Sequence, residues 1–203
     1  CNFRRTEEWQ EDKSIEDCIN IVQEEVKITG SIIVYANDIE ELDKCIAKLA
    51  KIKHVENFKI VIVHHSSLLV RDVFEYIKDQ THFEELFAVQ SNSGETHTGE
   101  IHFLDEAFKR AKNGFIFSVR ASQDLDENML DKINYLVYHE MEKLLFVPPN
   151  ENTHTTVFMA AIYKFLKGNR FWSFEEKLNA IAKHQNIESQ ISSWDSINEK
   201  YPN

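Results

Sequence analysis

The sequence predicts an α/β protein with a mostly parallel sheet flanked by helices, and the stretch from residue 31 to residue 63 carries this prediction. Residues 31–35 are a short apolar run rich in β-branched side chains, which is typical of a strand buried on both faces. A helical stripe follows, and residues 58–63 form a second apolar run. Strand, helix and strand in so short a stretch make a βαβ unit, for which we expect a right-handed crossover.

The predicted helix of this unit is defined by apolar residues at helical spacing, namely Ile39, Leu42, Ile46 and Leu49. Asn37 or Asp38 is the expected N-cap, because both side chains carry an oxygen that accepts a hydrogen bond from a first-turn amide. The second strand ends in the polar residues 64–67. Ligands of such units bind beyond the carboxyl ends of the strands, so we place the candidate site there.

The rest of the chain continues the alternation of strands and helices, which favours a largely parallel sheet. Residues 91–99 are the most turn-rich segment, and residues 157–166 are apolar and expected to become helical towards their end. The apolar spacing predicts helices within residues 15–26, 69–77, 103–111, 130–141 and 174–181, and strands at residues 86–90, 115–119 and 144–147.

We predict one domain at residues 30–184, with an N-terminal arm and helix at residues 1–29 and a C-terminal tail at residues 185–203. The chain begins with Cys1 and not with Met, so we expect it to be part of a longer polypeptide. Its 42 % hydrophobic and 28 % charged residues are typical of a soluble globular protein.

The net charge of −11 argues against general binding to nucleic acid or to anionic membranes, because the long-range field repels both. The sequence contains no apolar run long enough for a membrane span. Its three cysteines have no metal-type spacing, and two of them lie on helical stripes as buried thiols would. We therefore expect a cytoplasmic protein with reduced cysteines.

Arg120 directly follows the predicted strand at residues 115–119 and is the strongest candidate for binding a ligand. Its guanidinium can hold a diphosphate through a bidentate fork and stabilise the charge of a leaving group. The structural alternative is a salt bridge to Asp124, Asp126 or Glu95.

His64 and His65 are adjacent on a strand, so their side chains are expected on opposite faces and a two-histidine metal site is not predicted. One of them could stack on a base or hydrogen-bond a ribose. Glu175 and Glu176 follow an aromatic cluster, where apolar surroundings raise a carboxylate's proton affinity as a general base requires. The alternative is a capping box formed by Ser173 and Glu176.

Three segments together resemble a known family. Residues 34–46 (Val-Tyr-Ala-Asn-Asp-Ile-Glu-Glu-Leu-Asp-Lys-Cys-Ile), residues 106–116 (Glu-Ala-Phe-Lys-Arg-Ala-Lys-Asn-Gly-Phe-Ile) and residues 174–178 (Phe-Glu-Glu-Lys-Leu) are similar to segments of family 2 glycosyltransferases. The resemblance covers roughly residues 30–180 by this matching of segments. It implies their GT-A fold, which is a Rossmann-like α/β fold.

The signature residues of that family differ here. Where its second strand ends in Val-Asp-Asp-Gly-Ser, residues 63–67 read Val-His-His-Ser-Ser, and where its metal-binding Leu-Asp-x-Asp-Asp is expected, residues 119–123 read Val-Arg-Ala-Ser-Gln. Arg120 and Ser122 therefore replace the two aspartates that hold the divalent metal. An arginine does not ligate a cation, so no metal site is predicted.

The resemblance implies a nucleotide-diphosphate sugar as donor substrate and a glycan as acceptor. It implies a nucleoside or diphosphate role for Tyr35, Asn37, His64, His65, Arg120 and Ser122, and a catalytic base at Glu175 or Glu176. Two functions stay open. The chain is either a glycosyltransferase that works without a metal, or a catalytically inactive GT-A-like module for binding or assembly within a larger glycosylation or surface-polysaccharide protein.

Overall fold

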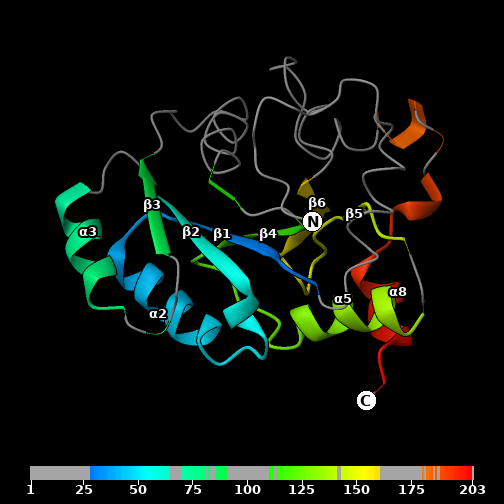
Figure 1. The fold of residues 1–203 in the computed structure, drawn as a ribbon, viewed down its shortest axis with the longest axis horizontal. Helices are drawn as coiled ribbons and strands as arrows, with labels where there is room; N and C mark the ends of the chain where they lie inside the picture. The colour runs from blue at the N-terminus through cyan, green and yellow to red at the C-terminus, as the bar shows by residue number, and fades with distance from the viewer. Residues whose placement is uncertain are drawn as a thin grey trace.

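Six strands form one sheet within the part of the chain that the structure describes, in the order β3-β2-β1-β4-β6-β5 (Figure 1). The computed structural model describes residues 28–64, 70–80, 82, 86–90, 110–111, 114–140, 143–160, 180, 182–184, 186 and 188–202. The strands are β1 (Gly30–Ala36), β2 (Phe58–His64), β3 (Leu86–Gln90), β4 (Phe115–Arg120), β5 (Phe146–Val147) and β6 (Thr156–Met159).

The sheet is mostly parallel, as the sequence predicted. β1 pairs in parallel with β2 on one side and with β4 on the other, and β2 pairs in parallel with β3. Only β6, among the described strands, runs the other way, between β4 and β5. The central strand β1 is buried on both faces, since Ile32, Ile33 and Val34 are all 0 % exposed.

Helix α2 (Ile39–Leu49) connects β1 to β2 and confirms the predicted stripe, because Leu42, Cys45, Ile46 and Leu49 are buried. Asp38 is its N-cap: the carboxylate Oδ1 accepts a hydrogen bond from the Glu41 amide at 2.8 Å. Burial raises the pKa of the Cys45 thiol to about 12, so this cysteine stays protonated at neutral pH, as a structural thiol does.

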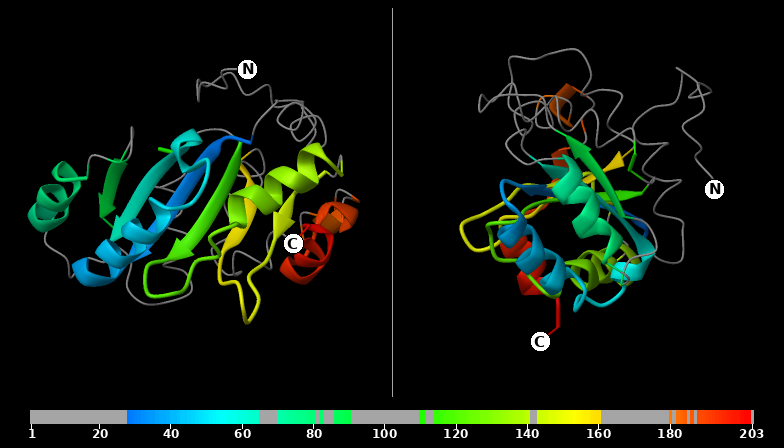
Figure 2. Two further views of the ribbon diagram at one scale, coloured as in Figure 1. Left: turned by 90° about the horizontal axis from the view of Figure 1, so that it is seen from below. Right: turned by 90° about the vertical axis from the view of Figure 1, so that its left-hand side faces the viewer.

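The remaining described helices are α3 (Val70–Lys78), α5 (Met129–Tyr138) and α8 (Trp194–Lys200). The three views agree that α2, α5 and α8 lie on one face of the sheet (Figures 1 and 2). None of the helices that the structure describes combines the length with the apolar character that crossing a membrane demands.

The C-terminal part of the fold contains two elements that the sequence patterns did not indicate. The apolar residues 156–159 form strand β6, and the segment assigned to a polar tail contains α8. Trp194 and Ile197 of α8 are 0 % exposed, and the Trp194 indole Nε1 donates a hydrogen bond to the Thr155 carbonyl at 2.7 Å. Residues 188–202 therefore pack against the sheet domain, with Phe146 of β5 bridging to Ile191.

Candidate functional site

The sheet reverses its strand order between β1 and β4. From β1 the chain passes to β2 and then β3 on one side, and it returns to place β4 on the other side of β1. Helices or loops that leave neighbouring strands in opposite directions open a crevice at their carboxyl ends, and ligands of open α/β sheets bind at such a switch point. The candidate site is therefore the edge where β1 and β4 end.

Tyr35 and Arg120 lie on either side of this switch point. They are direct register partners on β1 and β4, so their side chains leave the sheet on the same face. Tyr35 is partly buried against the core, whereas Arg120 is exposed. The backbone is hydrogen-bonded at the carboxyl ends of β1 and β4, where the Ala121 amide donates to the Tyr35 carbonyl at 2.8 Å.

Asn37 and Ser122 occupy the two segments that leave this edge, and both are exposed. Asn37 lies in the bend between β1 and the N-cap of α2. Ser122 lies in the turn after β4, where the Gln123 amide donates a hydrogen bond to the Arg120 carbonyl at 3.0 Å. The structure thus brings together four of the predicted site residues: Tyr35, Asn37, Arg120 and Ser122.

His64 ends β2 at the same edge of the sheet but on the other face. Its register partner on β1 is Ala36, one residue beyond Tyr35, and strand residues alternate between the two faces. The His64 side chain is 1 % exposed, so it is covered in this arrangement. The nucleoside contact expected of His64 stays a prediction.

Two of the three carboxylates considered as salt-bridge partners of Arg120 form ion pairs with lysines. Asp124 pairs with Lys48 of α2, and this contact lowers the pKa of the Asp124 carboxyl. Asp126 pairs with Lys132 of α5 at 2.7 Å. Glu95, the third alternative, lies outside the described residues.

The described residues at the end of β4 offer no pair of aspartates to a divalent cation. Arg120 and Ser122 stand where a metal-binding pair of aspartates is expected, and the nearest carboxylates after β4 are the two that lysines already neutralise. Across the described ranges, no three histidine, cysteine, aspartate or glutamate side chains gather as metal ligands would.

Sequence reasoning gave no role to Glu41, which lies in the first turn of α2, directly after the edge where β1 ends. Its Oε2 atom is buried and has no hydrogen-bond partner among the described residues. Buried polar atoms are nearly always hydrogen-bonded, so this carboxylate oxygen is an exception within the described part of the chain. No pattern in the sequence signals this, because it depends on how α2 packs.

Three of the predicted site residues cannot be placed. His65, Glu175 and Glu176 lie outside the described residues, so the roles predicted for them stay predictions.

The fold has solved counterparts. The crystal structure of S. aureus TarS matches with a TM-score of 0.58 at 15 % identity, over 80 % of this chain and 34 % of that one. TarS 1–349 matches in complex with UDP (TM-score 0.56, 13 % identity, 80 % and 57 % covered) and in complex with UDP-GlcNAc (0.51, 14 %, 80 % and 55 %). This chain therefore spans little more than half of that fragment.

These likenesses, at such low identity, show the fold alone: the chain has the α/β, GT-A-like glycosyltransferase fold that the sequence predicted. No protein-family model matches the sequence. No curated protein matches it by sequence either.

Proposed function

We propose that this domain binds a nucleotide-diphosphate sugar at the shared edge of β1 and β4 and transfers the sugar to a glycan acceptor without a divalent metal. The observation that carries the proposal is the register pairing of Tyr35 with Arg120 at the switch point of the sheet. The structures of TarS with UDP and with UDP-GlcNAc support a nucleotide sugar as the ligand of this fold.

Each residue at this edge is given a role by its chemistry. Tyr35 and Asn37 contact the nucleoside, with an aromatic ring and an amide from the segment where β1 ends. Arg120 holds the diphosphate, with Ser122 as a second hydrogen-bond donor. His65, which alternation along a strand is expected to direct to the face opposite His64, completes the nucleoside side in this proposal.

The transfer step is an inverting displacement. Glu175 or Glu176 takes the proton of the acceptor hydroxyl, whose oxygen then forms a bond to the anomeric carbon of the donor sugar. The bond from that carbon to the diphosphate oxygen breaks, and the electron pair leaves with the nucleoside diphosphate. Arg120 compensates the negative charge that grows on the diphosphate, which is the task of the metal in metal-dependent enzymes.

A second candidate function is a GT-A-like binding or assembly module, without transfer, inside a longer glycosylation or surface-polysaccharide protein. The replacement of both aspartates after β4 by Arg120 and Ser122 favours it. Under either function we place the domain in the cytoplasm, which suits the buried and reduced thiol of Cys45. The two functions differ in turnover: only the first releases a nucleoside diphosphate when donor and acceptor are both present.

Binding without a metal is the direct test. We expect isothermal titration of the domain with UDP, GDP and their sugars to give the same dissociation constant, within about twofold, in EDTA and in manganese, because the guanidinium does not need a cation to meet a diphosphate. Binding that appears only with manganese would contradict the role of Arg120. The absence of binding to any of these ligands at millimolar concentration would contradict nucleotide binding as a whole.

A further inference from the structure

A second site lies beside the first, on the other side of β4. A polar pocket of about 410 Å³ opens between the loop after β4, the turn between β5 and β6, and helix α8. This volume falls within the range of roughly 300–1,000 Å³ that small-molecule sites occupy. The residues that line it are Asp124, Leu125, Asp126, Lys132, Asn152, Thr153, Asn198 and Tyr201.

The topology connects the pocket to the candidate nucleotide edge. β4 and β5 are both antiparallel to β6, so they run in the same direction, and the turn that leaves β5 lies at the edge where β4 ends at Arg120. Figure 2 shows the loop after β4 and the turn after β5 extending from that one edge. The loop of residues 121–126 therefore runs from Arg120 to the wall of the pocket, which its residues 124–126 help to form.

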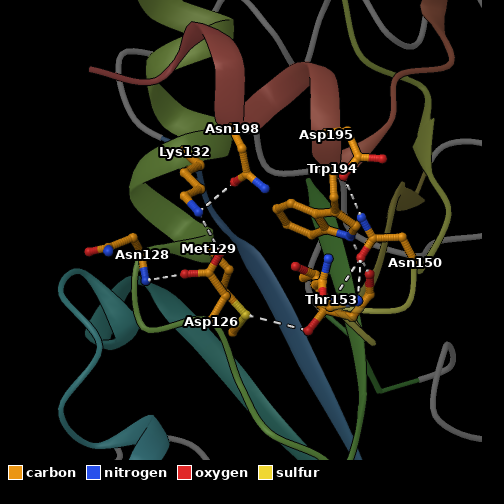
Figure 3. Close-up of polar contacts among 11 residues, drawn as sticks. Asp126, Asn128, Met129, Lys132, Asn150, Thr153, Trp194, Asp195 and Asn198 are labelled. Atoms are coloured by element: carbon orange, nitrogen blue, oxygen red, sulfur yellow. Dashed lines mark hydrogen bonds and ion pairs between the residues drawn. The ribbon is translucent and has the colours of Figure 1, made fainter. Parts of the chain in front are cut away.

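The walls of the pocket are held in place before any ligand arrives. The Lys132 ammonium donates to Asp126 Oδ2 at 2.7 Å and to Asn198 Oδ1 at 2.6 Å, which joins α5, the loop and α8 (Figure 3). On the opposite wall, Asn150 Oδ1 accepts from the Thr153 amide at 2.6 Å. Polar groups that are preorganised in this way lose little entropy when a ligand binds.

The charges of the pocket favour a neutral ligand. Asp126 pairs with Lys132 and Asp124 with Lys48, so each carboxylate of the pocket already has a cationic partner. An anion would meet two carboxylates and a lysine that is already paired. The residues that remain for a ligand are mostly amides, hydroxyls and one aromatic ring.

Tyr201 adds the aromatic ring and a hydroxyl donor. Its ring packs edge-on against Tyr135 at 5.7 Å between centroids, which fixes its orientation. Burial, with the charges of Asp131 and Asp126, raises the pKa of Tyr201, so its hydroxyl keeps its proton at neutral pH. Amides, hydroxyls and an aromatic ring together match the alternating polar edges and apolar faces of a sugar ring.

We propose that this pocket binds a neutral saccharide. The binding itself does not depend on the nucleotide site, whereas the view that this saccharide is the acceptor glycan rests on the proposed transfer function.

The test uses the whole chain and ligand-observed NMR. Saturation transfer is measured to the methyl glycosides of glucose, galactose and N-acetylglucosamine at millimolar concentration, without nucleotide. We expect a signal for at least one of them. Asn152→Trp fills the exposed mouth of the pocket without removing a wall contact, and Asn198→Ala removes an amide from it. Both should weaken saccharide binding at least about tenfold, which is the loss of one or two hydrogen bonds.

Glu199→Ala is the matched control, because Glu199 is the exposed neighbour of Asn198 on α8 and does not line the pocket. It should leave the saccharide signal unchanged, and all three variants should bind UDP like the unmodified chain. No signal from any glycoside, or signals that persist in both pocket variants, would overturn the proposal. UDP binding in the absence of saccharide binding would reject this pocket alone, while the reverse result would reject only the nucleotide site.

Discussion

Arg120→Ala is expected to weaken binding of UDP and of UDP sugars by about 10- to 150-fold. A hydrogen bond to a charged group contributes about 1.5–3 kcal/mol, and each 1.4 kcal/mol changes a dissociation constant tenfold. Arg120 is a cation at the end of β4, and it is the register partner of Tyr35 on β1. The measurement is isothermal titration in EDTA, with uridine as a ligand that lacks the diphosphate.

Two further variants sharpen this result. Arg120→Lys keeps the charge and loses the fork, so its affinity should lie between those of the unmodified chain and of Arg120→Ala. Arg71→Ala is the control, because Arg71 is an exposed arginine of α3 that pairs with Glu75 at 2.9 Å and is not among the residues proposed to bind the ligand. Uridine affinity should be the same in all four proteins. An Arg120→Ala protein that binds UDP as tightly as the control would show that the diphosphate is held elsewhere.

Gly30→Ala is expected to lower the free energy of unfolding by about 3 kcal/mol or more, at the upper end of the cost of overpacking. A Cβ at Gly30 would lie 1.8 Å from the Phe115 carbonyl oxygen, which is backbone of the paired strand β4 and has no side-chain freedom to move away. β1 and β4 must then separate, and this changes the spacing of Tyr35 and Arg120 at their other end. Urea unfolding followed by circular dichroism measures the loss.

The control for this prediction adds one carbon to β4 at a half-buried side chain. Ser118 of β4 is half-buried, and Ser118→Thr should change the free energy of unfolding by less than about 1 kcal/mol, since a β-branched residue suits a strand. A Gly30→Ala protein as stable as Ser118→Thr would show that β1 and β4 are not in the tight contact described here.

The parallel half of the fold was predictable from sequence because its signals are local. The β-branched run of β1, the stripe of α2 and the cap at Asp38 each depend on residues close in the chain. Strand β6 was not predictable in this way. Its apolar residues 157–159 show no alternation, so they fit a buried helix and a buried strand equally. Helix α8 contributes only two fully buried side chains, Trp194 and Ile197, in a polar segment.

The candidate site was predictable in position but not in detail. Tyr35 and Arg120 could be predicted to lie close together, because each stands where a strand ends and the carboxyl ends of parallel strands meet at one edge of the sheet. The face on which His64 lies depends on the register with β1, which no local pattern fixes. The polar pocket joins residues from positions 124 to 201, and such a combination exists only once α8 has packed.

A crystal structure of the domain with UDP, grown in EDTA, tests the central claim most directly. We expect a diphosphate oxygen within hydrogen-bonding distance of the Arg120 guanidinium, and the nucleoside beside Tyr35 and Asn37 on the same face of the sheet. UDP bound away from the edge where β1 and β4 end, or held there through groups other than Arg120, would contradict the claim.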